Sequence, residues 1–423
     1  MAELIEKIWM SDGAGLTRRD RRPCTYHPYI PDRLERRDFR LSGETAADVA
    51  DAEAAIMRLN REASTLLDME ALARILLRAE SVASSWIEGL TIGARRLLRA
   101  EAAHEVGLSS RDVTADEVLG NINAMVMAVS LSGEGKPIKL ETLCDIHRRL
   151  LGGTPHERYG GVIREEQNWI GGSAHNPCAA QFVPPPHEHV RPLLEDLCEF
   201  CNGDSVPAVV QAAIAHAQFE TIHPFVDGNG RAGRALIHLI LRRRGLAPRV
   251  VPPVSLILAT YSIDYLEALT GYRYIGDASS EEAYEGLNRW VSLFAGACSR
   301  AVEDANRFEQ EAQSMEETWR ARLGKVRSGS STDLLLRSLA GIPILTVNSA
   351  ARLLGRTFKV ANMAVDDLVQ AGILRQITIG RRNRAFEAPE VIAAFTDLER
   401  RLASPLADTR VAPPTRSIPA RHQ

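Results

Sequence analysis

The strongest constraint on the fold is a stretch rich in glycine and charge between two segments with helical patterning. It runs from His223 to Arg234 and reads HPFVDGNGRAGR. Apolar residues at helical spacing precede it over 208–219 and follow it over 235–244. Glycines let a backbone approach a ligand closely, and the amides at the start of a helix favour an anion. Arg231 and Arg234 are one turn apart and could grip two phosphate groups. We predict a phosphate-binding turn with a base, His223, at its entrance.

Most of the remaining chain has helical periodicity, which predicts a mainly α-helical protein. Aromatic residues are only 5% of the chain, and Leu, Ala, Arg and Glu are abundant. Further helices are expected from residue 44 onward and over 69–86, 95–104, 115–130, 139–151, 188–201 and 281–312. Residues 1–43 carry turn and charge signals and predict an extended arm over the helical body.

The segment 152–186 breaks the helical rhythm with paired glycines and three consecutive prolines. Short extended stretches at 168–170 and 181–183 predict a β-hairpin flap. An exposed hairpin edge could pair with an extended peptide. Covering the core is the alternative role of the flap, and the two roles are compatible.

A small separate unit follows a predicted linker at 324–332. Its helices at 346–354 and 359–371 are followed by two short strands, which predicts a winged helix. Seven basic residues favour a nucleic-acid face: Arg352, Arg356, Lys359, Arg375, Arg381, Arg382 and Arg384. Asp366 and Asp367 on the presumed reading helix favour a protein partner, so both alternatives are open. Residues 403–423 contain four prolines and predict a disordered tail.

Charge and cysteine content exclude several other classes of protein. The formal net charge is −3, so no global field drives the chain to nucleic acid or to an anionic membrane. No apolar run approaches the ~20 residues needed to span a bilayer, and no basic-then-apolar signal stands at the start. We expect a cytoplasmic protein without a membrane partner. The six cysteines are too sparse for a disulfide scaffold, and Cys198 and Cys201 lack a second pair for zinc, so buried or incidental thiols are expected.

Gly228, Gly230 and Gly233 match the GxGxxG dinucleotide fingerprint by accident. That fingerprint needs a preceding strand and a βαβ context, whereas here a helix precedes it. The whole stretch instead resembles the signature of the Fic family, HPFx(D/E)GNGRxxR, at all nine of its defined positions. The resemblance implies a helical Fic domain with a small β-hairpin flap, followed by a C-terminal winged-helix domain.

Proteins of this family transfer a nucleotide monophosphate, usually AMP from ATP, to a hydroxyl side chain of a target protein. The resemblance implies that His223 is the general base for that hydroxyl, as suits an imidazole with a near-neutral pKa. It implies that Asp227 is the Mg²⁺ ligand, because a carboxylate suits a hard cation. ATP and Mg²⁺ are therefore the expected cofactors.

The resemblance also assigns the phosphate contacts. Gly228, Asn229 and Gly230 match an anion hole, Arg231 matches the contact to the leaving phosphates, and Arg234 matches the clamp on the γ-phosphate. Tyr265 lies where relatives form the adenine pocket, with ordinary core packing as the alternative. In the flap, Asn168, Trp169, Ile170 and Gly171 match the segment that pairs with the target, although Trp169 could equally be a packing residue.

An inhibitory element is implied by a second, weaker pattern. Ser84, Glu88 and Gly89 fit the family motif (S/T)xxxE(G/N), whose Glu forms a salt bridge with the second motif arginine, here Arg234. A carboxylate on that guanidinium would compete with the γ-phosphate. The alternative is a surface Glu at a helix end.

The resemblance therefore predicts a regulated protein adenylyltransferase, with removal of AMP as a further activity that the sequence does not decide. The alternative is a DNA-binding regulator whose Fic domain senses a nucleotide. We expect an N-terminal region at 1–110 with the inhibitory motif, a Fic core at 111–322 and a winged helix at 333–400. The target protein, the nucleotide and the oligomeric state are left open, a homodimer included.

Overall fold

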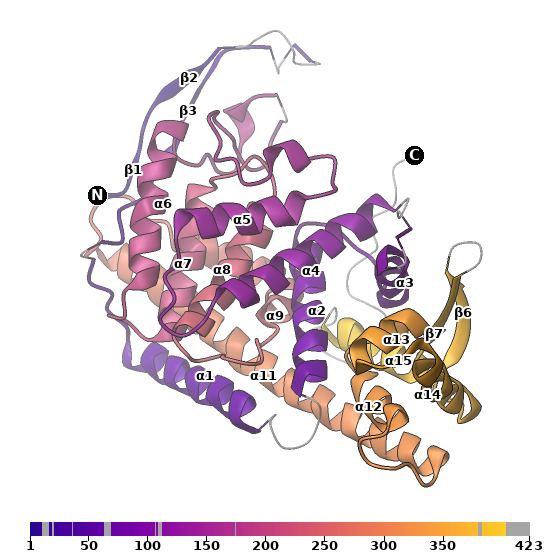
Figure 1. Ribbon diagram of the computed structural model, residues 1–423. Coiled ribbons are helices and arrows are strands. Elements are labelled where there is room, and N and C mark those ends of the chain that lie inside the picture. The colour runs from indigo at the N-terminus through magenta and orange to yellow at the C-terminus, as the bar shows by residue number, and fades with distance from the viewer. Residues whose placement is uncertain are drawn as a thin grey trace. The chain divides into compact units, whose positions relative to one another are not determined.

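The computed structural model describes residues 1–10, 17–18, 21–35, 37–62, 69–105, 107–108, 112–173, 175–379 and 383–402. The fold is mainly helical with small antiparallel sheets, as the sequence predicts (Figure 1). The chain divides into two compact units. The first comprises Met1–Glu53, Ala124–Leu246 and Ile263–Gly296, and the second Ala54–Asn123, Ala247–Ser262 and Ala297–Gln423. Among the described elements, four helices contribute residues to both units: α1 (Gly43–Glu62), α4 (Val113–Leu131), α10 (Ser262–Gly271) and α11 (Glu281–Leu323). The predicted domain limits stay predictions.

The core of the first unit is the pair α7 (Ala208–Ile222) and α8 (Asn229–Arg243). Every residue of α7 is buried, because small alanines allow neighbouring helices to approach on all sides. The helices α5 (Leu140–Leu151) and α6 (His187–Asn202) pack against α8 and α7 respectively. Trp290 is fully buried and donates its Nε1–H to the carbonyl of Ala213 at 2.8 Å.

The N-terminal arm consists of short strands, two in each antiparallel pair. β1 (Glu3–Leu4) pairs with β4 (Tyr29–Ile30), and β2 (Lys7–Trp9) pairs with β3 (Cys24–Tyr26). The sequence predicts the extended conformation but not the pairing, because strands of two or three residues carry no readable periodicity. The buried Asp196 of α6 accepts hydrogen bonds from the amides of Leu34 (2.7 Å) and Glu35 (3.0 Å), which fixes the arm to the helices.

A disulfide joins Cys24 in β3 to Cys178 in the short 3₁₀ helix Pro177–Ala179, with the Cα atoms 5.8 Å apart. The prediction of incidental thiols is wrong for these two residues. They are 154 positions apart in sequence, so spacing alone held no signal for the pairing. The remaining cysteines are free thiols: Cys144, Cys198, Cys201 and Cys298.

The predicted flap exists, but its hairpin is smaller than expected. Instead of two strands, the described residues of the flap have two isolated antiparallel bridges, Ile170–Phe182 and Ser173–Asn176. The amide of Ile170 donates to the carbonyl of Phe182 at 2.8 Å, and the amide of Phe182 returns the bond at 3.2 Å. Gly171 and Gly172 follow with φ of 75° and 77°, conformations that turn the chain away from a longer ladder.

The second unit contains α2 (Met69–Ile87), α3 (Ala94–Glu105) and α9 (Val254–Thr260). The helices α2 and α9 pack closely. Glu80 of α2 is fully buried and accepts hydrogen bonds from the amide of Ser255, at 2.7 Å, and from its hydroxyl. Because Ser255 lies in the first turn of α9, the carboxylate satisfies donors that have no acceptor within the helix. The sequence reading did not predict α9 or the following α10 (Ser262–Gly271).

The C-terminal part of the second unit has the element order of a winged helix. The elements are α12 (Ser331–Ser338), β5 (Ile344–Leu345), α13 (Val347–Leu354), α14 (Phe358–Gln370), β6 (Arg375–Ile379), β7 (Asn383–Glu387) and α15 (Pro389–Leu402). The strands form one antiparallel sheet in the order β5-β7-β6. The structure adds β5 to the prediction; its two residues are too few for a periodic signal. The predicted wing tip, with Arg381 and Arg382, and the predicted tail at 403–423 lie outside the described residues.

The ends of the winged-helix helices follow their capping residues. Thr346 and Thr357 accept hydrogen bonds from the third residue of α13 and α14, and Gly355 ends α13 in the left-handed conformation. Within the described ranges, no helix has the length and apolarity needed to cross a bilayer.

Candidate active site

His223 ends α7 in an unusual backbone conformation. Its φ of 49° and ψ of 62° are left-handed, and it is the only non-glycine residue with positive φ among those the structure describes. Its amide donates to the carbonyl of Phe219 at 2.9 Å. Such a conformation disfavours a side chain with a Cβ and persists only where the surroundings hold it. The residues around His223 therefore hold its backbone in this conformation, which sets the direction of its side chain at the end of α7.

Arg164, a residue that sequence reasoning missed, supplies much of that support. Its side chain is buried and donates to the carbonyls of His223 (2.9 Å), Pro185 (2.6 Å), Glu166 (3.0 Å) and Ile222 (3.3 Å). Burial lowers the pKa of the guanidinium to about 10, so the group stays charged at neutral pH. Arg164 thus joins the base of the flap to the end of α7.

Asn229 holds the turn from the other end. Its Oδ1 accepts from the amide of Phe225, and its Nδ2 donates to the carbonyl of Phe225, both at 2.8 Å. Asn168, predicted to face the target, donates its Nδ2 to the carbonyls of Phe225 (3.1 Å) and His223 (3.3 Å). Both amide side chains therefore brace the turn between His223 and Asn229.

His147 of α5 is a second residue that sequence reasoning missed. The amide of Gly161 donates to its Nδ1 at 3.0 Å, so the proton is on Nε2, which donates to the carbonyl of Asp227 at 2.8 Å. Burial lowers the pKa of the imidazole to about 4, which keeps it neutral. Its ring stacks on Phe225 with centroids 3.7 Å apart. No motif could have revealed it, because an isolated histidine in a helix is usually structural.

Two motif glycines are required for different reasons. Gly228 has a φ of 76°, and a Cβ there would lie 2.9 Å from Leu150 and 3.4 Å from His147. Gly233 lies where α8 crosses α7, and a Cβ there would lie 2.5 Å from Oε1 of Glu220. The first glycine permits the turn, and the second permits the helix crossing. The predicted turn is also shorter than expected, since α8 already begins at Asn229.

The start of α8 concentrates positive charge. Arg231 is 5% exposed, and its Nε and Nη1 have no hydrogen-bond partner among the described residues. Its Nη2 lies 3.5 Å from Oδ2 of Asp227, whose side chain is 42% exposed. Arg234, one turn further along, is 1% exposed. Buried guanidinium donors, the first amides of a helix and an exposed carboxylate together suit a phosphate group with a divalent cation.

Tyr265 of α10 is buried in the core of the first unit. Its hydroxyl is 2.8 Å from Nε2 of the fully buried His216, and the two rings stack. Burial lowers the pKa of His216 to about 3, so the imidazole is neutral. This packing corresponds to the structural alternative for Tyr265, and its contact with a nucleotide stays a prediction.

The residues of the predicted inhibitory motif lie at the end of α2. Ser84 is fully buried within the helix, and Glu88 lies one residue beyond its last residue, in an exposed turn. Gly89 has a φ of 81°, a left-handed conformation that is common just past the C-terminal end of a helix.

The described residues include no group of three His, Cys, Asp or Glu side chains that could hold a metal by themselves. A single carboxylate, Asp227, would therefore need ligand oxygens to complete a Mg²⁺ site. This fits the way the ion binds in nucleotide sites, through one or two carboxylates and substrate phosphates.

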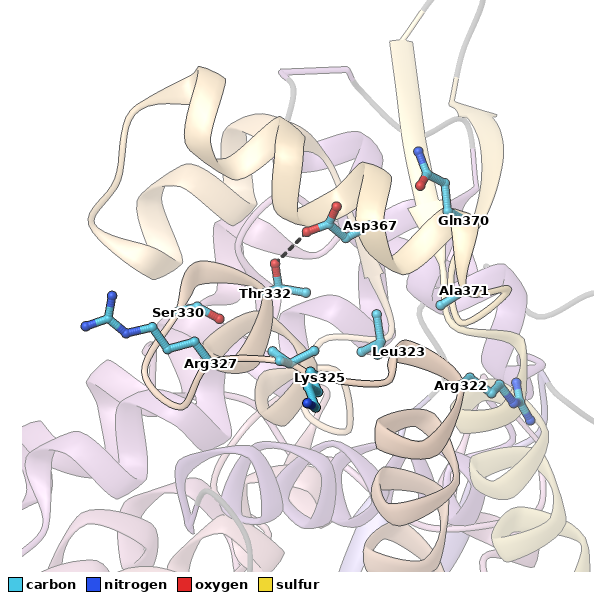
Figure 2. A pocket seen from close by; sticks show the side chains of 10 residues that line it. Arg322, Leu323, Lys325, Arg327, Ser330, Thr332, Asp367, Gln370 and Ala371 are labelled. Carbon is cyan, nitrogen blue, oxygen red and sulfur yellow. Dashed lines mark hydrogen bonds between the residues drawn. The ribbon is translucent and has the colours of Figure 1, made fainter.

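A separate pocket of about 520 Å³ lies at the linker after α11, against the end of α14. Figure 2 shows its polar lining, including the 2.8 Å hydrogen bond from Thr332 to Asp367. The guanidinium groups of Arg322 and Arg327 point in different directions (Figure 2). Because these cations do not converge on one point, we assign no ligand to the pocket.

Fold and site define a helical protein built around a glycine-rich turn between two buried helices. Residues 137–241 match the family model "Fic/DOC family", and residues 46–130 match "Fic/DOC family N-terminal". The chain thus carries a Fic/DOC family domain preceded by the N-terminal region of that family. It is distantly similar to Fic adenylyltransferases.

Two curated relatives illustrate that similarity. Protein adenylyltransferase fic-1 of Caenorhabditis elegans is 33% identical over 174 residues, which are 39% of this chain and 32% of the relative. Protein adenylyltransferase Fic of Drosophila virilis is 34% identical over 141 residues, 32% of this chain and 27% of the relative. The match therefore spans about a third of the length of these relatives.

Among solved structures, a Fic family protein from Desulfovibrio desulfuricans G20 has the same fold. The superposition has a TM-score of 0.50 at 22% sequence identity and covers 83% of this chain and 97% of that one.

Proposed function

We propose that this protein is an adenylyltransferase that transfers AMP from ATP to a Ser, Thr or Tyr hydroxyl of a target protein. The observation that carries the proposal is the buried side chain of Arg231. Two of its nitrogens have no hydrogen-bond partner within the described chain, and it lies beside Asp227 at the start of α8. Burying unpaired donors is costly, so this group is expected to bind an anion. The similarity to adenylyltransferases supports the choice of reaction.

The residues of the turn would divide the work as follows. His223 takes the proton of the target hydroxyl on its imidazole, while the hydroxyl oxygen bonds to the α-phosphorus and pyrophosphate leaves. Asp227 holds Mg²⁺, which neutralises charge on the phosphates. Arg231 and the first amides of α8 bind phosphate oxygens. Arg164, Asn229 and His147 hold the turn in place and do not touch the reacting atoms.

We further propose that Glu88 silences the enzyme by binding Arg234. A guanidinium as buried as that of Arg234 requires anionic or carbonyl partners. Two anions cannot both accept hydrogen bonds from the same N–H groups at once. The γ-phosphate of ATP and the carboxylate of Glu88 would therefore compete. Removing the carboxylate frees the arginine for the nucleotide.

The test is intact mass spectrometry after incubation with each nucleoside triphosphate and Mg²⁺. Glu88→Gly should gain the mass of AMP on itself or on added lysate proteins, and the wild type should gain much less. The double variant Glu88→Gly/His223→Ala should bind ATP without gaining mass. A folded Glu88→Gly protein that gains no mass with any nucleotide would contradict the proposed activity. Retained transfer in the double variant would remove His223 as the base.

Duplex DNA is a second candidate partner, favoured by the exposed start of α14. Arg352, Arg356 and Lys359 are exposed and make no ion pair within the described ranges. The acidic residues that weigh against DNA lie in the other half of the helix. Asp366 accepts from Asn362 at 2.7 Å, and Asp367 from Thr332 at 2.8 Å.

Arg375, a residue of the predicted basic face, forms an ion pair with the buried Glu387 and is therefore less available to bind phosphate. Fluorescence anisotropy with a duplex oligonucleotide should show binding that weakens as salt rises and is lost in Lys359→Glu. Lys325→Glu, in the linker, is the matched control. Binding unaffected by Lys359→Glu, or absent at low salt, would exclude this face.

A further inference from the structure

The strand pair β2–β3, here called the ribbon, contacts both limbs of the flap (residues 168–183). Trp9 and Cys24 are directly opposite each other in the ribbon. The ring of Trp9 lies edge-on to Trp169 with centroids 5.4 Å apart, and Cys24 is bonded to Cys178. Trp169 precedes the glycine turn of the flap and Cys178 follows it. One cross-strand pair thus links the ribbon to each side of the flap tip.

The covalent bond is the strongest of these links. The ribbon strands have three residues each, and a ladder that short is marginal on its own. Among its described residues, the flap has two isolated bridges, Ile170–Phe182 and Ser173–Asn176, and two successive glycines at its turn. Lys7 also pairs with Glu188 at 3.0 Å, but both side chains are well exposed, and such pairs contribute little. Breaking the disulfide would leave the ribbon and flap joined mainly by one ring contact.

The bond is also open to small thiols. Cys178 is exposed and Cys24 is half-buried, whereas Cys198, Cys201 and Cys298 are buried free thiols. Exchange requires a thiolate to reach one sulfur of the disulfide, so access decides which bonds react. Cys178 is the more exposed of the two bonded cysteines, so we expect its Sγ to be the sulfur that is attacked.

From these observations we propose that Cys24 and Cys178 form a reversible thiol–disulfide exchange site that latches the ribbon onto the flap. A low-molecular-weight thiolate attacks Sγ of Cys178 and forms a mixed disulfide, while Cys24 leaves as a thiolate and takes up a proton. A second small thiolate attacks the small-molecule sulfur, releases a small-molecule disulfide, and leaves Cys178 as a thiolate that is then protonated. A disulfide of the same small thiol drives the reverse reaction. The latch is closed in an oxidising compartment and opens in a reducing one.

Closing the latch restricts the flap, so a segment that pairs with the flap loses less conformational freedom on binding. If the flap receives the target, which rests on the proposed function, the oxidised protein modifies its target more efficiently than the reduced protein. Nucleotide binding at α8 changes less than target modification, because Arg164, Asn229 and His147 hold the turn without the ribbon.

The test equilibrates the full chain in buffers of reduced and oxidised glutathione. Peptide mapping without reductant then follows the Cys24–Cys178 link, and hydrogen–deuterium exchange follows the flap. Reduction should speed exchange of the Ile170 and Phe182 amides by about tenfold or more, while peptides of α7 and α8 stay unchanged. Cys178→Ser and Cys24→Ser should show the fast exchange without reductant. Cys144→Ser, which removes a free thiol, is the control and should behave as the wild type.

Two results would overturn the latch: equal flap exchange in the oxidised and reduced protein, or free Cys24 and Cys178 thiols at every glutathione ratio. Measuring AMP transfer by Glu88→Gly in both redox states separates the latch from the proposed function. Redox-dependent exchange without AMP transfer in either state supports the latch and contradicts the adenylyltransferase. Transfer without redox-dependent exchange does the reverse.

Discussion

The conservative substitution Arg164→Lys should destabilise the first unit strongly. The guanidinium makes four hydrogen bonds to the carbonyls of His223, Pro185, Glu166 and Ile222 in a buried position. A lysine ammonium has three N–H donors on one nitrogen instead of a planar fork, so it can serve about two of these spread carbonyls. Each buried carbonyl left unsatisfied costs about 1–3 kcal/mol, so the change should cost about 2–6 kcal/mol. That is a large share of the stability of a typical domain, which is about 5–15 kcal/mol.

Urea unfolding, followed by circular dichroism, measures this loss. The matched control is Arg191→Lys, because Arg191 is 65% exposed and its pairing with Glu195 is at 4.0 Å. This control should stay within about 0.5 kcal/mol of the wild type. If Arg164→Lys were as stable as the control, the hydrogen bonds of Arg164 would contribute nothing to stability. The left-handed conformation of His223 would then need another explanation.

Two further predictions concern the crossing of α7 and α8. Gly233→Ala should destabilise the fold by about 1–3 kcal/mol, because the new Cβ would meet Glu220, Phe219 and His216 in a packed core. Gly296→Ala has open space around its Cβ and should stabilise the fold by up to about 1 kcal/mol. Denaturant midpoints of the two variants check this, and shifts of the same sign would refute it. His216 titrates near 6.5 in the unfolded chain but near 3 in the fold, so the unfolded chain binds a proton first as the pH falls. The stability that the neutral imidazole contributes is fully present well above pH 6.5, and about 3 kcal/mol of it should be lost by pH 4.5. His216→Gln should lack this part of the pH dependence, and parallel stability curves for wild type and variant between pH 7 and 4.5 would disprove it.

The limits of sequence reasoning are clearest for residues whose partners are distant. His147 lies 80 positions from Asp227, and Arg164 lies 59 positions from His223. Each stands among other polar residues in its own segment, so no local pattern separates it from a surface residue. The Cys24–Cys178 bond was missed for the same reason, and the strands of the arm and β5 were missed because they are too short for periodicity.

For Asn168 and Asn229, the sequence motif did not determine which hydrogen bonds the side chains make. The sequence reading placed Asn168 at a target surface and Asn229 among the phosphate contacts. In the structure both bind the carbonyl of Phe225 and hold the turn. An amide side chain both donates and accepts hydrogen bonds, so only its neighbours decide which bonds form.

By itself, the sequence determined the helical class, the two helices and following strand pair of the winged helix, and the position of the motif between two helices. These follow from apolar periodicity, capping residues and glycines, which act over a few residues. Only the tertiary structure decided what holds the motif: Arg164 and His147 beneath the turn, Gly233 at the helix crossing, and the ribbon bonded to the flap. Those contacts join segments that are far apart in the chain, and packing in three dimensions brings them together.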